Sequence, residues 1–398
     1  MLLQIIISLL LGILAGTITG LIPGIHINLI SVLLISLSSS FFYQTNPLYL
    51  ITFITAMAIT HTFLDFIPSI FLGCPDTDTE LSILPGHKLL KKGLGYQAIL
   101  LTAYGSLAAI FILILITFPS ILIIKSTYPV IQKLIPYILI LISITLILFE
   151  KRKFQALFVF LLTGALGYLV LNNNFNLTQP LFPLLTGLFG SSMLILTIKN
   201  KTTIPKQKIS KPKTKLFKPL LGALIASPLC SFLPGLGSGQ AAIIGSTITK
   251  SQSSPKQFLV LLGATNTLVM GFSFISLYII SKTRTGATLA IQQIIGTPST
   301  NILLLILTTT LITSFFAFPL TIFLAKTFSE KIHNLNYTIA SIITLTFLTI
   351  IVTLISGILG TTILIISTLT GLYCIQLNVR RSNMMGCLLI PTIIFYLI

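Results

Sequence analysis

Two proline–glycine pairs interrupt apolar stretches that would otherwise continue as helices, Pro23-Gly24 and Pro234-Gly235. Proline lacks a backbone donor and glycine tolerates positive φ, so a helix rarely continues through such a pair. The helix that starts after each break has free N–H groups and a positive dipole end, which favour an anion. We therefore expect a substrate site for a small anion at the two breaks, made by Gly24, Ile25, His26, Asn28, Gly235, Gly237, Ser238 and Gln240.

A second set of polar residues interrupts the apolar run near 48–72 and aligns loosely with a set in the second half of the chain. His61 and Asp65 are four residues apart, so on a helix they share a face. A charge at the centre of a membrane helix costs about 2.5–3.5 kcal/mol on insertion scales, so we expect Asp65 to face the protein interior. We expect coupling to Na⁺ or H⁺ at Asp65, supported by His61, Thr62, Asn266 and Thr267.

The composition is that of a membrane protein. The chain has 398 residues, 54% of them hydrophobic and 8% charged, and its mean hydropathy is +1.04. Soluble proteins carry about 25% charged residues. Apolar runs long enough to cross a bilayer recur from end to end. We predict an all-α polytopic membrane protein with about 12–14 membrane segments, near 2–22, 26–42, 48–72, 98–124, 131–149, 154–171, 181–199, 218–235, 240–250, 256–281, 301–326, 338–356, 358–377 and 384–398.

The net charge of +18 comes from 24 Lys and Arg against 6 Asp and Glu. These basic residues lie mainly in short links between apolar runs, which is the pattern that sets membrane orientation. Nucleic-acid binding is therefore not expected. The four cysteines have no CxxC spacing, so neither a zinc site nor a disulfide framework is predicted. We expect no cofactor other than Na⁺ as a candidate coupling ion.

The basic residues also predict the topology. Lysines are dense between 199 and 218, which places a linker, residues 200–217, in the cytoplasm between membrane repeats 1–199 and 218–398. An odd number of apolar runs precedes the linker, so the two repeats would enter the membrane from opposite faces. Both termini would then be extracytoplasmic. Inverted repeats whose helices are broken or re-entrant at matching positions are typical of secondary transporters.

Three motifs resemble the large membrane subunit of tripartite tricarboxylate transporters, the TctA family: residues 21–24 (Leu-Ile-Pro-Gly), 232–237 and 84–98. The resemblance implies an ion-coupled carrier for carboxylates in the cell membrane. It also implies an extracytoplasmic solute-binding protein and a small membrane subunit as partners. Residues 73–78 differ from the Asn-Thr-Pro-Gly motif of bacterial members, and here the chain is closer to an archaeal, stand-alone branch.

Other functional classes fit the residues less well. A transporter or channel for another small solute is the alternative. A channel would need a continuous polar stripe through several helices, whereas polarity is confined to the broken regions. An intramembrane enzyme would need paired carboxylates or His–Glu zinc spacing, and a single Asp65 beside His61 does not meet that requirement. A purely structural role would leave the broken helices without a pathway to line. The sequence therefore favours a permease for di- or tricarboxylates that is not an enzyme.

Overall fold

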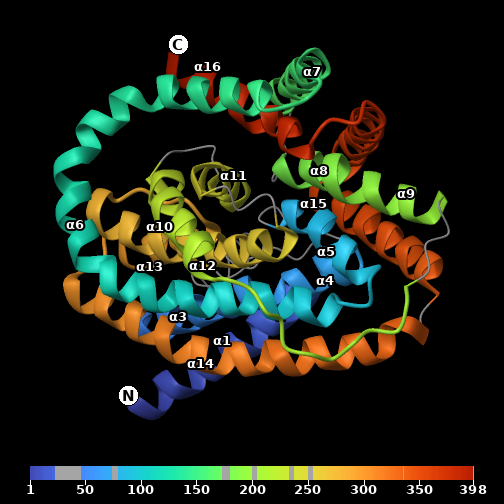
Figure 1. The fold of residues 1–398 in the computed structure, drawn as a ribbon. Helices are drawn as coiled ribbons and strands as arrows, with labels where there is room; N and C mark the ends of the chain where they lie inside the picture. The colour runs from blue at the N-terminus through green and yellow to red at the C-terminus, as the bar shows by residue number, and fades with distance from the viewer. Residues whose placement is uncertain are drawn as a thin grey trace.

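The computed structural model shows a bundle of helices of very unequal length (Figure 1). Within the described residues every regular element is a helix, which confirms the predicted all-α class. Eight helical stretches in this part of the chain are long and apolar enough to cross a membrane. The structure describes residues 1–22, 46–73, 79–172, 180–199, 204–232, 237–249, 254–334 and 336–397.

The predicted apolar runs match the helices closely along both halves of the chain. The first half contributes α1 (Leu2–Leu21), α3 (Pro47–Leu64), α4 (Phe66–Phe71), the 3-10 turn η1 (Glu80–Ser82), α5 (Ile83–Leu90), α6 (Gly95–Leu148), α7 (Lys153–Asn172), α8 (Leu181–Leu185), the π-helical turn η2 (Thr186–Ser191) and α9 (Ser192–Lys199). The second half contributes α10 (Phe217–Phe232), α11 (Ser238–Thr249), α12 (Pro255–Ile280), α13 (Gly286–Ile295), α14 (Thr300–Lys331), the 3-10 turns η4 (Ile332–Asn334) and η5 (Arg381–Met385), α15 (Tyr337–Gln376) and α16 (Gly386–Leu397).

At two places the structure joins apolar runs that the sequence predicts as separate membrane segments. The runs predicted at 98–124 and 131–149 belong to one helix, α6, which is 54 residues long and bends around one side of the molecule in Figure 1. Three prolines lie inside α6, and an internal proline can bend a helix without ending it. The runs predicted at 338–356 and 358–377 both lie in α15, where Gly357 at φ 64° interrupts the helical backbone. The run predicted at 26–42 lies outside the described residues.

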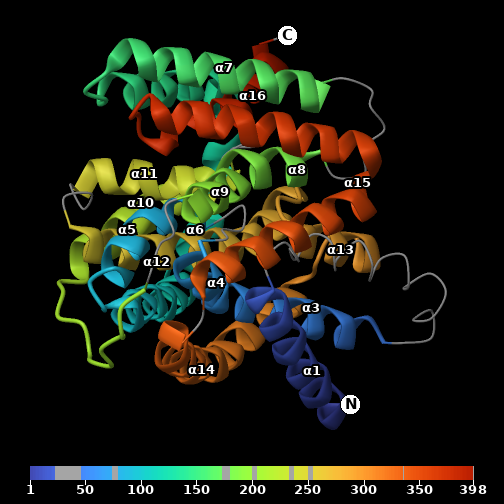
Figure 2. The same cartoon turned by 90° about the vertical axis from the view of Figure 1, so that its right-hand side faces the viewer.

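Helices α3 and α12 form the centre of the molecule. In an apolar 18-residue window of each span, 89% of the residues in Pro47–Phe71 and 94% in Pro255–Ile280 are buried, against 22% in Thr338–Gln376. Since lipid tails can cover apolar side chains, the exposed helices fit the periphery of a membrane protein. In Figure 2, α7 and α16 lie at one end of the molecule, and α1 and α14 lie at the other.

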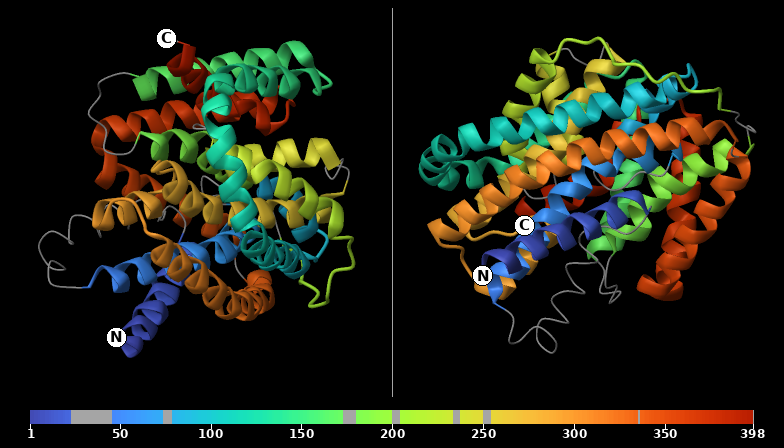
Figure 3. Two further views of the ribbon diagram at one scale, coloured as in Figure 1. Left: turned by 90° about the vertical axis from the view of Figure 1, so that its left-hand side faces the viewer. Right: turned by 90° about the horizontal axis from the view of Figure 1, so that it is seen from below.

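The two central helices have reciprocal neighbours. Helix α3 packs against α1 in its own half and against α14 in the other half. Helix α12 packs against α10 in its own half and against α6 in the other half. Figure 3 shows α1, α3 and α14 side by side. Such an exchange of partners is expected for two related repeats, and the inverted topology itself stays a prediction.

Helix α1 approaches α3 through a stripe of three glycines one turn apart, Gly12, Gly16 and Gly20. A Cβ built on Gly16 would stand 2.5 Å from the carbonyl oxygen of Met57 and 2.7 Å from the Cβ of Thr60. Small residues at this spacing let membrane helices pack with their backbones close together. The stripe therefore sets the distance between α1 and α3.

A leucine at position 16 has no room in this contact. We expect Gly16→Leu to destabilise the folded protein by about 1–3 kcal/mol, because overpacking forces the two backbones apart. Thermal unfolding of the purified protein in detergent measures the loss. The matched control is Ile18→Leu at an exposed position of the same helix, which should leave the transition unchanged. Equal transitions for the two variants would contradict the tight contact.

Candidate functional site

Asp65 lies at the junction of α3 and α4, and Pro68 explains why the helix breaks there. A proline has no N–H and its ring crowds the carbonyl four residues earlier, which here is that of Leu64. The chain nevertheless stays close to helical, with Asp65 at φ −59° and ψ −21°. Ser69 donates its hydroxyl to the backbone carbonyl of Asp65 at 2.7 Å. The carboxylate is thus held at a break inside a buried helix.

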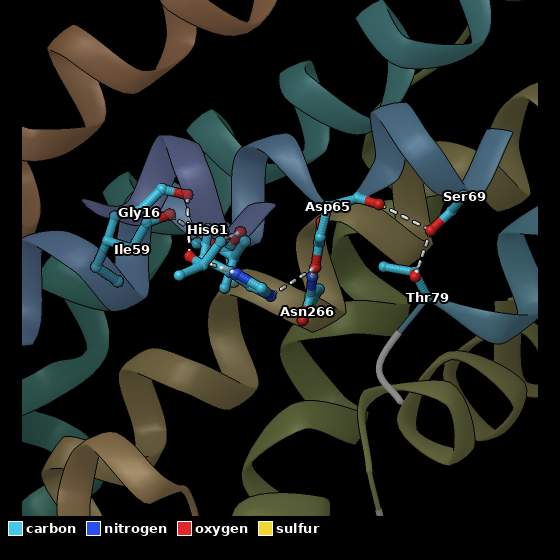
Figure 4. Close-up of polar contacts among 10 residues, drawn as sticks. Gly16, Ile59, His61, Asp65, Ser69, Thr79 and Asn266 are labelled. Carbon is cyan, nitrogen blue, oxygen red and sulfur yellow. Dashed lines mark hydrogen bonds and ion pairs between the residues drawn. The ribbon is translucent and has the colours of Figure 1, made fainter. Parts of the chain in front are cut away.

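The Asp65 carboxylate bonds across the two halves of the chain. Asn266 Nδ2 on α12 donates to Asp65 Oδ2 at 2.7 Å, and His61 Nε2 lies 4.0 Å from the same oxygen (Figure 4). Asp65 is 3% exposed and Asn266 is 4% exposed. A buried carboxylate needs such partners, because its desolvation is otherwise very costly. This contact confirms that Asp65 faces the protein interior.

The hydroxyl of Thr19 links His61 to α1. The Thr19 hydroxyl donates to the carbonyl of Gly16 at 3.2 Å, and its oxygen lies 3.0 Å from His61 Nδ1. Which of the two atoms donates in the second contact follows from the tautomer of His61. The imidazole thus bridges Thr19 of α1 and the Asp65 carboxylate.

The two predicted threonines also meet. Thr267 Oγ1 on α12 donates to Thr62 Oγ1 on α3 at 3.2 Å, and Thr62 passes its own hydrogen to the carbonyl of Ile59 at 2.8 Å. Both side chains are buried. The five residues predicted for ion coupling are therefore gathered between α3 and α12. Whether they bind an ion stays a prediction.

Further polar contacts extend this group toward two loops. On one side, the Ser69 and Thr79 hydroxyls lie 2.6 Å apart, next to the start of η1 (Figure 4). On the other side, Ser273 of α12 lies 3.3 Å from Thr285, the N-terminal cap of α13. Because α3 and α12 are both deeply buried along their length, these contacts form a row of polar side chains inside the molecule.

The second break is described only in part. Helix α11 begins at Ser238 after Gly237, as the Pro-Gly pair predicts, and Ser238 is 1% exposed. Gln240 lies in the first turn of α11. Gly24, Ile25, His26, Asn28 and Gly235 lie outside the described residues. The anion site at the two breaks stays a prediction.

Five residues of the polar row were not predicted as site residues: Thr19, Ser69, Thr79, Ser273 and Thr285. Thr19 stands inside the first Pro-Gly stretch, three residues after Gly16, and the glycine spacing of α1 was the available signal that it meets α3. Ser69 is four residues after Asp65, on the same helical face. In the described part of the chain no group of His, Cys, Asp and Glu could hold a metal ion.

A bundle of apolar helices that closes around a buried carboxylate defines a polytopic membrane protein with a polar interior. A family model identifies the kind of membrane protein. The tripartite tricarboxylate transporter TctA family matches residues 6–386, and the chain belongs to that family. An uncharacterized protein of Methanocaldococcus jannaschii is 35% identical over 361 residues, which cover 87% of this chain and 88% of the relative. No solved structure matches the chain.

The bond between Asp65 and Asn266 can be tested by a double-mutant cycle. We expect Asp65→Leu and Asn266→Leu to be coupled by about 1–3 kcal/mol, because the amide donates to a charged or polar buried oxygen. Thermal unfolding in detergent measures the stability of the two single variants and the double variant. The control cycle is Thr62→Val with Thr267→Val, a neutral pair for which we expect less than about 1 kcal/mol. Additive effects at Asp65 and Asn266 would contradict the contact.

A second buried histidine, His87 on α5, predicts a pH dependence. The helix α5 is not among those long enough to cross a membrane. Burial, together with the positive charges of Lys91 and Arg381, lowers the pKa of His87 from 6.5 to about 4. Below pH 6.5 the unfolded chain binds this proton first, so stability falls as the pH drops toward 4. We expect a loss of about 2 kcal/mol between pH 7 and pH 5 that His87→Asn lacks. An equal loss in both proteins, measured by thermal unfolding, would contradict it.

Proposed function

We propose that this chain is a secondary active transporter of small organic anions, di- or tricarboxylates, which couples their movement to protons by alternating access. The observation that carries the proposal is the Asp65 carboxylate, buried between the halves of the molecule and bonded to Asn266. Ionisable residues inside membrane proteins generally mark ion pathways and proton relays. Membership of the TctA family supports carboxylates as the substrate class.

The proton is favoured over Na⁺ as the coupling ion by the partners of Asp65. Na⁺ is a hard cation that takes oxygen ligands, whereas Asp65 has the imidazole of His61 and the amide nitrogen of Asn266 beside it. The amide N–H of Asn266 competes with a metal cation for the carboxylate. The His61–Asp65 pair instead offers two groups that can each carry a proton, with His61 Nε2 and Asp65 Oδ2 4.0 Å apart.

Alternating access requires two repeats that move around a fixed site. The loose match between the halves pairs His61-Thr62 with Asn266-Thr267, so Thr62 and Thr267 would be equivalent residues. Equivalent residues touch each other only near the axis that relates two repeats. Their hydrogen bond and the reciprocal packing of α3 and α12 support an axis beside Asp65. The anion would bind nearby at the helix N-termini after the Pro-Gly pairs. In this proposal a solute-binding protein and a small membrane subunit are its partners, as the family name implies.

Uptake into proteoliposomes tests the transport function. The full chain is reconstituted, and entry of labelled citrate is followed under an inward proton gradient, an inward Na⁺ gradient or neither. We expect uptake with the proton gradient only, and a loss of roughly tenfold or more in Asp65→Asn, which cannot take up the proton. Because the partner subunits are missing from these vesicles, exchange of labelled for unlabelled citrate across citrate-loaded vesicles is measured as well.

The control for this variant is Glu330→Gln, which removes a carboxylate that is 53% exposed and paired with Lys326. It should transport like the wild type. Uptake that follows the Na⁺ gradient would show that Na⁺, not the proton, is the coupling ion. The proposed carrier function would still stand. Absence of both uptake and exchange for di- and tricarboxylates would overturn the carrier itself.

A further inference from the structure

The linker between the two halves is pinned to the first half of the molecule. Gln207 Oε1 accepts from the backbone N–H of Gly95 at 2.7 Å, and Gln207 Nε2 donates to the carbonyl of Leu90 at 3.1 Å. The backbone N–H of Lys208 donates to the carbonyl of Gly93 at 2.7 Å. Gln207 is 7% exposed. Residues 204–216, which we call the strap, therefore have a fixed course across the turn from α5 to α6.

A second bond continues the attachment. Gln97 Nε2 on α6 donates to Ser210 Oγ at 2.7 Å. Two glutamines, one from each side, thus hold residues 207–210 against the start of α6. A polar segment of this composition needs no such contacts when it serves as a flexible tether, because solvent alone satisfies it. The attachment gives the lysines that follow a defined place.

Beyond Ser210, exposed and half-buried residues alternate along the strap. Lys211, Lys213 and Lys215 are exposed, whereas the residues between them are half-buried. This pattern of exposure places the three lysines on the side of the strap that faces away from the protein. No Asp or Glu occurs between residues 151 and 329, so this row has no acidic neighbour along the chain.

The row ends where a helix with an exposed apolar stripe, α10, begins. On α10 the residues Phe217, Leu221, Ile225 and Leu229 are 77%, 40%, 41% and 37% exposed. They recur every four residues, so they form one apolar stripe along the helix. An exposed apolar stripe on a membrane protein is covered by lipid tails, and its end is level with the headgroups. Lys218, in the first turn of the same helix, is exposed as well.

We propose that Lys211, Lys213, Lys215 and Lys218 form a binding surface for the phosphate groups of anionic phospholipids. The strap holds the ammonium groups at headgroup level beside the apolar stripe of α10, so one lipid can contact both. Lysines near an anionic bilayer surface attract it additively, and the attraction is screened by salt. This surface is separate from the polar row at Asp65 and does not depend on the proposed transport function.

Native mass spectrometry of the full chain in detergent tests the surface, with phosphatidylglycerol and phosphatidylcholine as the lipids titrated. We expect the triple variant Lys211→Gln/Lys213→Gln/Lys215→Gln to raise the apparent Kd for phosphatidylglycerol by roughly 10- to 100-fold. Binding of phosphatidylcholine should not change. The difference between the two lipids should shrink at high salt.

The matched control removes the same charge from exposed lysines elsewhere, Lys125→Gln/Lys133→Gln/Lys153→Gln. We expect less than a twofold change in the apparent Kd. Equal weakening in the two triple variants, or wild-type affinity in the strap variant, would overturn the proposal. Since all six positions are exposed, neither variant should disturb folding.

The role of the attachment is tested by Gln207→Leu, which keeps every lysine. Limited trypsin cleavage after Lys206, Lys208, Lys213 or Lys215 shows whether the strap has detached, and thermal unfolding shows whether the helices remain folded. We expect detachment together with weaker binding of phosphatidylglycerol. Detachment with unchanged affinity would overturn the claim that the strap positions the lysines.

Discussion

The burial of one carboxylate constrains the arrangement of everything around it. Asp65 lies where two halves of an apolar protein meet, and a carboxylate removed from water must be given donors or a proton. Asn266 supplies the nearest donor from α12, and His61 stands one turn away on α3. The requirement therefore fixes how α3 and α12 face each other. A rotation of either helix by one residue would turn these partners away from Asp65.

Close helix packing makes that arrangement attainable without bulky side chains between the helices. The glycine stripe of α1 brings Gly16 against Met57 and Thr60, and it thereby places Thr19 within reach of His61. Gly263 of α12 likewise stands against the backbone of Thr102 in α6. In a membrane, where lipid tails are as apolar as the helices, such van der Waals contact is a main source of association. Close packing of the apolar helix surfaces around the polar row therefore holds its side chains in place.

Local sequence patterns predict structural features that depend on a single helix. They do not predict features that depend on the packing of two helices. The bounds of α1 and α7, and the shared face of His61 and Asp65, follow from apolar run length and helical spacing. The meeting of residues 61–65 with residues 266–267 follows from the loose likeness between the halves. The continuity of α6 does not, because whether a proline ends a helix or bends it is decided by tertiary packing. The partner of His61 and the course of residues 204–216 likewise depend on surfaces far away along the chain.

Stability alone gives no reason to place Asp65 at this position. Well-packed apolar residues commonly replace a buried ion pair with no loss of stability, since the desolvation of two ionisable groups offsets their attraction. In the proposed carrier, the five polar side chains between α3 and α12 serve transport rather than folding. Asp65 and Asn266 join the two halves of the chain by a side-chain hydrogen bond, and His61 stands beside that bond. A proton taken up at this contact would change how the halves are held together, which is the coupling that the proposed function needs.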